Sequence, residues 1–156
     1  MSKSIFSEFT IRIVKPSDDA DFLFHLLKER DSRANISHKK MPTFNAHVKF
    51  IESKPYKKWY IVLGRKKKSQ NNNSFLQTKV GSIYLSKNDE IGIFVLKNFQ
   101  GMDIGKFALK ELMKRNPRKR FLANVNPKNN KSMNFFKNNN FKLIQYTFEL
   151  DNSKYS

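Results

Sequence analysis

Apolar runs rich in Val, Ile, Phe and Tyr recur along the chain and predict β-strands. The predicted strands cover 10–14, 59–63, 80–85, 90–96, 120–125 and 141–150. Lys87-Asn-Asp89 has the composition of a turn, so the strands on either side of it are expected to pair antiparallel. The polar run Ser69–Ser74 is typical of a mobile loop tip.

Apolar residues at helical spacing predict four helices between these strands. The first begins at Pro16 with Ser17 as its N-cap, and Thr43 caps the second, which ends before Pro55. The third covers about 103–115 and the fourth covers 129–137. The resulting order, β-α-α-β-β-β-α-β-α-β, predicts one mixed α/β sheet with helices on its faces.

The composition and the apolar pattern exclude several kinds of functional site and membrane segment. The chain has 156 residues and no cysteine, so we expect one domain, no disulfide and no cysteine-based metal site or nucleophile. The histidines His25, His38 and His47 lack i,i+4 spacing, so no metal site is predicted. The chain has neither an apolar run of about 20 residues, which a membrane span needs, nor the apolar core of a signal peptide. The expectation is a cytoplasmic protein with no membrane association.

The net charge of +18, from 31 Lys+Arg and 13 Asp+Glu, suits a polyanion: nucleic acid, an anionic membrane or a phosphorylated small molecule. A general compositional bias towards Lys and Asn explains the charge equally well. The basic clusters Arg65–Lys68 and Lys114–Arg120 fall in a predicted hairpin loop and a predicted helix-to-strand turn. They are interpreted first as solvated loops and second as binding patches.

The segment from Glu90 to Leu109 is the most informative stretch. An apolar strand ends in the turn Gln100-Gly-Met-Asp-Ile-Gly105, and a helical pattern begins at once. The first N–H groups of a helix have no intrahelical partner, and the helix dipole favours negative charge there. The turn is therefore predicted to hold the phosphates of a ligand.

This turn, placed after the fourth strand, resembles the motif Gln/Arg-x-x-Gly-x-Gly/Ala of the GNAT superfamily of acyl-CoA-dependent N-acetyltransferases. Two of its three key positions match. A second match is Asn126-Pro-Lys-Asn129-Asn-Lys-Ser132, followed by Phe136 and then Asn140-Phe141. The resemblance covers about residues 9–148. It implies a single domain over 1–156, with a core of about 9–150 and a mostly antiparallel sheet flanked by about four helices.

The resemblance also implies acetyl-CoA as cofactor. Backbone amides from Gly101 to Lys106 would bind its pyrophosphate, and its pantetheine arm would pair with the backbone of Phe94 and Leu96. Asn129 would contact the amide region of the cofactor, although capping the following helix is an equally good role. The cofactor site implied in this way comprises Phe94, Val95, Leu96, Gln100, Gly101, Met102, Asp103, Ile104, Gly105, Lys106, Asn129, Ser132 and Phe136.

Asp103 departs from the motif, which usually has Gly at that position. A carboxylate near a pyrophosphate is repelled, by about 1 kcal/mol at 4 Å in water. We therefore expect the Asp103 side chain to point away from the phosphates, with only its N–H used.

Acetylation of an amine requires a base, and the resemblance places that base at Glu90, at the start of the fourth strand. A surface carboxylate at a strand end is the alternative. Some members of the superfamily use a Tyr as general acid where this chain has Phe136. Tyr146 and Tyr84 are candidate replacements, and sheet-face or core aromatics are the alternative interpretation of both.

The acceptor site implied by the resemblance lies by the first two helices. Its candidate substrate-binding residues are Arg33, His38, His47 and Trp59, and His47 packing on a strand is the alternative. This part of the sequence resembles enzymes acting on amino-sugar nucleotides or on the N-termini of ribosomal proteins. The first hypothesis is therefore acetylation of a small, phosphorylated amine, such as a nucleotide-linked amino sugar. The others are a protein or peptide N-acetyltransferase, associated with the ribosome through its charge, and a non-catalytic nucleic-acid-binding module. A monomer and a homodimer are both compatible with the sequence.

Overall fold

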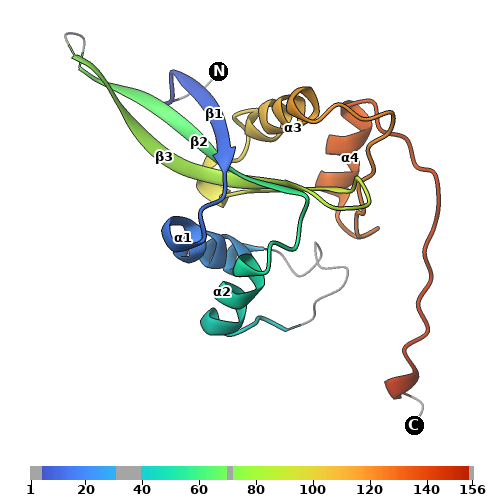
Figure 1. The fold of residues 1–156 in the computed structure, drawn as a ribbon. Helices are drawn as coiled ribbons and strands as arrows, with labels where there is room; N and C mark the ends of the chain where they lie inside the picture. Colours follow the sequence, from blue (N-terminus) through green and yellow to red (C-terminus); the bar gives the residue numbers. More distant parts are fainter. Residues whose placement is uncertain (1–4, 31–39, 70–71, 155–156) are drawn as a thin grey trace.

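The computed structural model describes residues 5–30, 40–69 and 72–154, and the side chains of 67–69 and 72–75 are not among those described. Its elements run in chain order as shown in Figure 1. They are β1 (Glu8–Ile13), α1 (Pro16–Glu29), α2 (Phe44–Glu52), β2 (Lys58–Ser69), β3 (Asn72–Leu85), β4 (Ile91–Val95), the 3-10 helix η2 (Lys97–Phe99), α3 (Ile104–Arg115), α4 (Asn130–Asn138) and the 3-10 helix η3 (Asn152–Lys154).

The four strands form one antiparallel sheet in the order β1-β2-β3-β4. The β2–β3 hairpin is long, with a register from Lys58↔Leu85 to Ser69↔Asn72. The basic run Arg65–Lys68 therefore lies within β2, and the prediction that it forms the hairpin loop is wrong. Ser69 and Asn72–Ser74 also belong to the strands, against the prediction of a loop tip over Ser69–Ser74, and residues 70–71 are outside the described part of the chain. The mixed α/β fold with a mostly antiparallel sheet and four helices is confirmed for the described residues.

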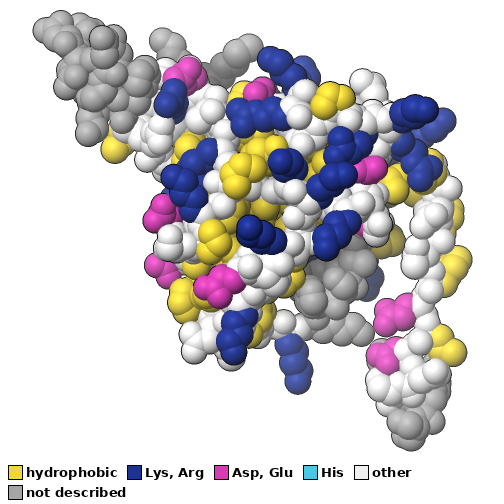
Figure 2. Space-filling view, viewed as in Figure 1, with side chains coloured by type: hydrophobic (Ala, Val, Ile, Leu, Met, Phe, Trp, Pro, Cys, Tyr) yellow, Lys and Arg dark blue, Asp and Glu magenta, His cyan; other side chains and the backbone are white. Residues whose placement is uncertain are grey.

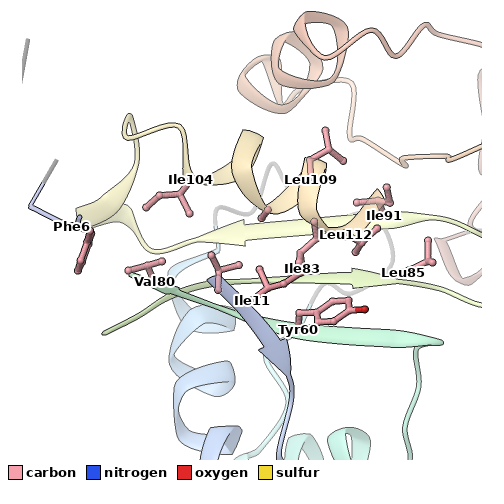
Figure 3. Close-up of a cluster of buried hydrophobic side chains, with 12 residues drawn as sticks. Phe6, Ile11, Tyr60, Val80, Ile83, Leu85, Ile91, Ile104, Leu109 and Leu112 are labelled. Carbon is pink, nitrogen blue, oxygen red and sulfur yellow. The ribbon is translucent and has the colours of Figure 1, made fainter. Parts of the chain in front are cut away.

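Helices cover both faces of the sheet, with α1 and α2 on one side and α3 on the other (Figure 1). Alternation along β2 sends Val62 into the core under α3, while Ile61 and Leu63 enter the core under α1 and α2. Figure 3 shows the first of these cores, where Ile104, Leu109 and Leu112 from α3 meet side chains from the strands.

The start of α1 differs from the prediction. Lys15, not Ser17, is the N-cap, and Pro16 occupies the first helical turn. The Lys15 side chain makes no capping hydrogen bond. Instead the Asp19 carboxylate, one turn into the helix, accepts a hydrogen bond from the Lys15 N–H at 2.7 Å. The Thr43 cap of α2 is confirmed, since its hydroxyl accepts a hydrogen bond from the Ala46 N–H at 3.1 Å.

The last two predicted strands do not form within one chain. Segment 120–125 makes only one parallel bridge, between Leu122 and Glu90. Segment 141–150 has no strand assignment, and residues 142–150 are all exposed. It extends away from the body in Figure 1. An apolar pattern with a period of two sets strand propensity, but a strand also requires a neighbouring edge, which the pattern does not supply.

Among the helices in the described ranges, none is both long and apolar enough to span a bilayer.

Candidate functional site: two cavities flanking strand β4

A cavity of about 440 Å³ lies where the start of α3 faces β4 and α4, and we call it the cradle cavity. Its walls come from β4, the Gln100–Gly105 turn and α4. They comprise Ile93, Val95, Phe99, Gln100, Gly101, Asp103, Ile104, Gly105, Lys106, Lys131, Ser132, Phe135, Phe136, Asn138 and Asn139.

The turn at the mouth of α3 takes two left-handed backbone positions. Gly101 has φ +86°, which glycine adopts without steric cost, and an added Cβ would meet nothing within 4 Å. Asp103 has φ 58° and is the N-cap of α3, with no hydrogen bond from its side chain to the helix end. The first N–H groups of α3 lack intrahelical acceptors. This arrangement, with open space beside Gly101, fits a phosphate group.

Polar side chains brace the turn and add positive charge. Gln100 donates from Nε2 to the Val95 carbonyl at 3.2 Å and accepts a hydrogen bond from Lys131 Nζ. Lys106 and Lys131 both line the cradle cavity. Gly105 lies close to α4, because a Cβ there would be 3.2 Å from the Phe135 ring.

The open edge of β4 presents different residues from those predicted. The Leu96 N–H donates to the Val80 carbonyl on β3, and by the alternation of an antiparallel ladder Phe94 also directs its backbone groups to β3. Ile91, Ile93 and Val95 face the other edge, and the Ile91 N–H donates to Leu122 O at 2.7 Å. The backbone pairing predicted for Phe94 and Leu96 is therefore not available, and Ile93 and Val95 take that place.

The second motif has a structural role in the described geometry. Asn129 caps α4, because its Oδ1 accepts a hydrogen bond from the Ser132 N–H at 3.1 Å. Of the residues predicted to bind the cofactor, Ser132 and Phe136 line the cradle cavity, whereas Leu96, Met102 and Asn129 are not among its walls. Met102 instead packs against the core under α3.

A second cavity, of about 490 Å³, lies by α1, α2 and the sheet, and we call it the aromatic pocket. It is lined by Leu23, Leu26, Leu27, Lys28, Arg30, Lys40, Met41, Pro42, Ala46, His47, Phe50, Tyr56, Trp59, Ser82, Tyr84 and Phe94. These described wall residues include three cations and no carboxylate.

Stacked rings and a guanidinium shape this pocket. The Tyr56 and Tyr84 rings lie 3.7 Å apart and 3° from parallel, and the Arg30 guanidinium lies 4.5 Å from the Phe94 ring centroid. Burial raises the pKa of both tyrosines. Burial lowers the pKa of Arg30, and the neighbouring Tyr84 and Tyr56 oppose that shift. Arg30, Phe50 and Tyr56 were missed as site residues, although the aromatic run Tyr56-x-x-Trp59 was a visible signal.

The structure brings His47 and Trp59 together in the aromatic pocket, while Arg33 and His38 lie outside the described residues. Trp59 donates from its indole N–H to Ser82 Oγ at 2.7 Å. His47 is 7% exposed, and its Nε2 has no hydrogen-bond partner among the described residues. Burial lowers the pKa of His47, which favours its neutral form.

Glu90 immediately precedes β4, at the bridge to Leu122. Its carboxylate accepts a hydrogen bond from the Asn124 amide, and its charge contributes to the raised pKa of Tyr84. Tyr146 does not reach either cavity within its own chain: it is 76% exposed in the unpaired segment 141–150. The prediction of Tyr146 as an acid therefore fails at this geometry, because the strand that would position it does not form.

Strand β4 separates the two cavities. Ile93 and Val95 line the cradle cavity and Phe94 lines the aromatic pocket, as expected for side chains that alternate between faces. Beyond the bridge at Glu90 and Leu122, no further bridge joins β4 to 120–125 in the described structure. No group of His, Asp and Glu among the described residues is arranged to hold a metal ion.

No protein-family model matches the sequence, and no curated protein matches it. Solved structures do match. A domain from Methanocaldococcus jannaschii has a TM-score of 0.72 and 21% identity, over 91% of this chain and 93% of that one. An N-acetyltransferase from Staphylococcus aureus has a TM-score of 0.61 and 18% identity, over 87% and 84%.

A proposed acetyltransferase from Salmonella typhimurium, solved with its cofactor acetyl-CoA, has a TM-score of 0.60 and 14% identity, over 85% of this chain and 78% of that one. At these identities the likeness shows the fold alone. The chain therefore has the fold of the N-acetyltransferases that it matches.

Proposed function

We propose that this protein transfers an acetyl group from acetyl-CoA to a primary amine, by direct attack within a ternary complex. The observation that carries the proposal is the placement of two cavities on opposite faces of β4, with Glu90 at the start of that strand. One cavity suits a phosphorylated donor and the other suits a ring-bearing acceptor.

The residues of the cradle cavity fit acetyl-CoA. Amides between Gly101 and Lys106, together with Lys131, would hold its pyrophosphate. The outward backbone groups of Ile93 and Val95 would bind its pantetheine arm as a neighbouring strand would. When bound, acetyl-CoA supplies a thioester whose acetyl carbon accepts the amine nitrogen while the thiolate leaves. The Salmonella typhimurium neighbour, with its bound acetyl-CoA, supports this choice of donor.

The amine must lose a proton, and we propose that Glu90 takes it, directly or through a water molecule. Glu90 is not among the wall residues of either cavity, and the proposal rests on its position just before β4, between them. The Asn124 amide donates to the Glu90 carboxylate, which fixes its orientation while leaving acceptor capacity free. The stacked Tyr56 and Tyr84 stay protonated because burial raises the pKa of each.

The walls of the aromatic pocket favour an anionic acceptor. Lys28, Arg30 and Lys40 line it without a carboxylate among the described wall residues, which disfavours polycationic amines. The rings of Tyr56, Trp59 and Tyr84 offer flat faces for a sugar or a base. A nucleotide-linked amino sugar combines the phosphates, the rings and the primary amine that this pocket suits.

The test combines a thermal shift with acetyl-CoA and a thiol-release assay over a panel of amines: amino-sugar nucleotides, free amino sugars, N-terminal peptides and polyamines. We expect stabilisation by acetyl-CoA and the fastest release with the amino-sugar nucleotides. No stabilisation at millimolar acetyl-CoA would overturn the enzyme proposal. A preference for peptides would retain the reaction and replace the acceptor.

Glu90→Gln tests the base. It should leave the acetyl-CoA thermal shift intact and slow turnover at neutral pH by about 100-fold, a usual contribution of a general base. Glu52→Gln makes the same change at an exposed position at the end of α2 and should have no effect. Unchanged turnover in Glu90→Gln would remove Glu90 from the mechanism.

A further inference from the structure

The C-terminal segment 143–150 exposes an unusual amount of apolar surface. Leu143, Ile144, Tyr146, Phe148 and Leu150 are 56%, 58%, 76%, 93% and 72% exposed, respectively. Figure 1 shows this part of the chain leaving the body, and hydrophobic side chains are visible along it in Figure 2. A contiguous exposed apolar surface usually marks an interaction site.

The segment also has the pattern of a half-buried strand. Ile144, Tyr146, Phe148 and Leu150 alternate with Gln145, Thr147 and Glu149. In an extended chain the first set would share one face and the polar set the other. An isolated strand is not stable in water, so this pattern requires a partner edge and an apolar surface to cover.

The body of the molecule has both an unpaired backbone edge and a partly exposed apolar surface, the two features that such a strand requires. Segment 120–125 exchanges backbone hydrogen bonds with 89–91 through Leu122 alone, which leaves its other side unpaired in the described structure. Helix α4 has no buried residue, and Phe121, Phe135 and Phe136 are only partly covered. The unpaired strand and the uncovered surface therefore occur on the same chain.

We propose that two copies of this chain exchange their C-terminal segments, so that 143–150 of each copy pairs with the open side of 120–125 of the other and packs on its α4. Each copy carries both halves of this contact, so a two-fold symmetric dimer satisfies them all at once. The proposal does not depend on the acetyltransferase activity.

The charge and the length of the C-terminal segment both support a second copy of the chain as its partner. Within 141–156 the charges of Lys142, Glu149, Asp151 and Lys154 cancel, in a chain whose net charge is +18. A neutral contact lets two basic bodies associate, whereas it gives a polyanion nothing to bind. The Phe141 N–H donates to the Phe136 carbonyl at 2.9 Å, which anchors the segment to the end of α4. Eight extended residues then span about 26 Å, enough to reach a neighbouring molecule.

Light scattering after size exclusion tests the assembly. The full-length chain should have twice the 18.4 kDa of one copy, and Phe148→Asp should convert it to a monomer. Thr147→Asp is the matched control, because it adds the same charge on the polar face of the same segment and should stay dimeric. A monomeric parent, or a dimer unaffected by Phe148→Asp, would overturn the proposal.

Cross-linking distinguishes exchange from simple association. The chain has no cysteine, so two differently tagged variants, Tyr146→Cys and Ala123→Cys, each carry a single thiol. After co-refolding of the mixture, a bis-maleimide reagent should join one tag to the other. The double variant should give a covalent dimer in denaturing gels. A compact monomer cross-linked within itself would show instead that the segment folds back on its own chain.

Discussion

Asp103 occupies a backbone conformation that few residues adopt readily, at a wall of the cradle cavity. Its φ of 58° carries a cost of about 1–2 kcal/mol for most side chains, although Asp tolerates it better than others. Its exposed carboxylate makes no hydrogen bond to the end of α3. The charge is favourable at the N-terminus of α3 through the helix dipole, but it repels an anionic ligand, so we expect it to weaken the binding of a phosphorylated donor.

Asp103→Gly should bind acetyl-CoA more tightly, by about fivefold, because the change removes a repulsion of about 1 kcal/mol. Asp103→Asn separates the two effects, since it keeps a side chain that tolerates the left-handed conformation and removes only the charge. Titration calorimetry of the three proteins measures the change. Equal or weaker binding in both variants would refute a repulsive role for the carboxylate.

Asp19 is a fully buried carboxylate that joins β1, α1 and β3. It forms ion pairs at 2.8 Å with Arg12 and with Lys79. Burial alone would raise the pKa of Asp19, but hydrogen bonds from Arg12, the Lys15 N–H and Lys79 lower it to about 2. Removing the charge would leave two cations without their counter-ion.

Asp19→Asn should therefore lower the free energy of unfolding at pH 7 by about 3 kcal/mol, as for other broken buried ion pairs. Because the folded pKa lies below the ordinary 3.8, the charge stabilises the fold above about pH 4 and loses that effect as the pH falls to about 2. Urea unfolding across this range should show the two proteins converging at low pH. Asp18→Asn, one residue earlier and exposed, is the control and should change little.

At the scale of elements, β4 is the part that organises the site. Its neighbour Tyr84 on β3 pairs directly with Gly92. A Cβ at Gly92 would lie 2.2 Å from the Tyr84 ring, so the glycine is what allows this ring to lie across β4 beside Tyr56. The absence of one side chain in β4 thus shapes the aromatic pocket.

Gly92→Ala should displace the Tyr84 ring and raise the KM for the acceptor by about tenfold, equivalent to about 1.4 kcal/mol. Affinity for acetyl-CoA should stay unchanged, because the cradle cavity uses the other face of β4. Gly64→Ala is the control: its Cβ would lie 2.7 Å from the Phe6 ring, which belongs to the core under α3. An acceptor KM that rises equally in both variants would indicate general destabilisation.

Elements governed by local pattern could be predicted from the sequence. The strands around 59–63 and 80–96, the Thr43 cap and the start of α3 all follow from apolar period and capping residues. The end of α4 also agrees with local preference, since Asn140, just after the helix, has φ 70°, a left-handed conformation that Asn tolerates. The turn before α3 was predicted from its glycines and the helical pattern that follows it, and Gln100, Gly101, Asp103, Ile104 and Gly105 line the cradle cavity.

Features set by distant contacts could not be predicted in this way. Asp19, near the start of α1, is buried because it pairs with Arg12 and Lys79 on two strands, which the local sequence does not indicate. Which backbone groups of β4 face its open edge depends on its register with β3. The segment 141–150 has a strand pattern, but whether it pairs depends on where it lies relative to an open backbone edge, which the pattern does not specify.

At the scale of the whole molecule, Lys and Arg side chains are distributed across the face drawn in Figure 2. Some of this charge is used internally: Arg115 donates to the Ile11 carbonyl at 3.1 Å, and Arg118 pairs with Asp89 at 3.1 Å. These two arginines belong to the basic cluster Lys114–Arg120 at the end of α3, so that cluster partly stabilises the fold. The remaining positive field acts on ligands from a distance.

That field leads to a prediction about rates. At saturating acetyl-CoA, kcat/KM for an amino-sugar nucleotide should fall steeply between low and physiological ionic strength, where the Debye length shortens to about 8 Å. A neutral amino sugar should show little change. Lys28→Gln and Lys40→Gln should flatten the salt dependence, because both cations line the aromatic pocket. Lys110→Gln, an exposed change on α3, should not. If the charged and neutral acceptors respond to salt alike, the cations of the pocket do not select for phosphate and the acceptor belongs to another class of amine.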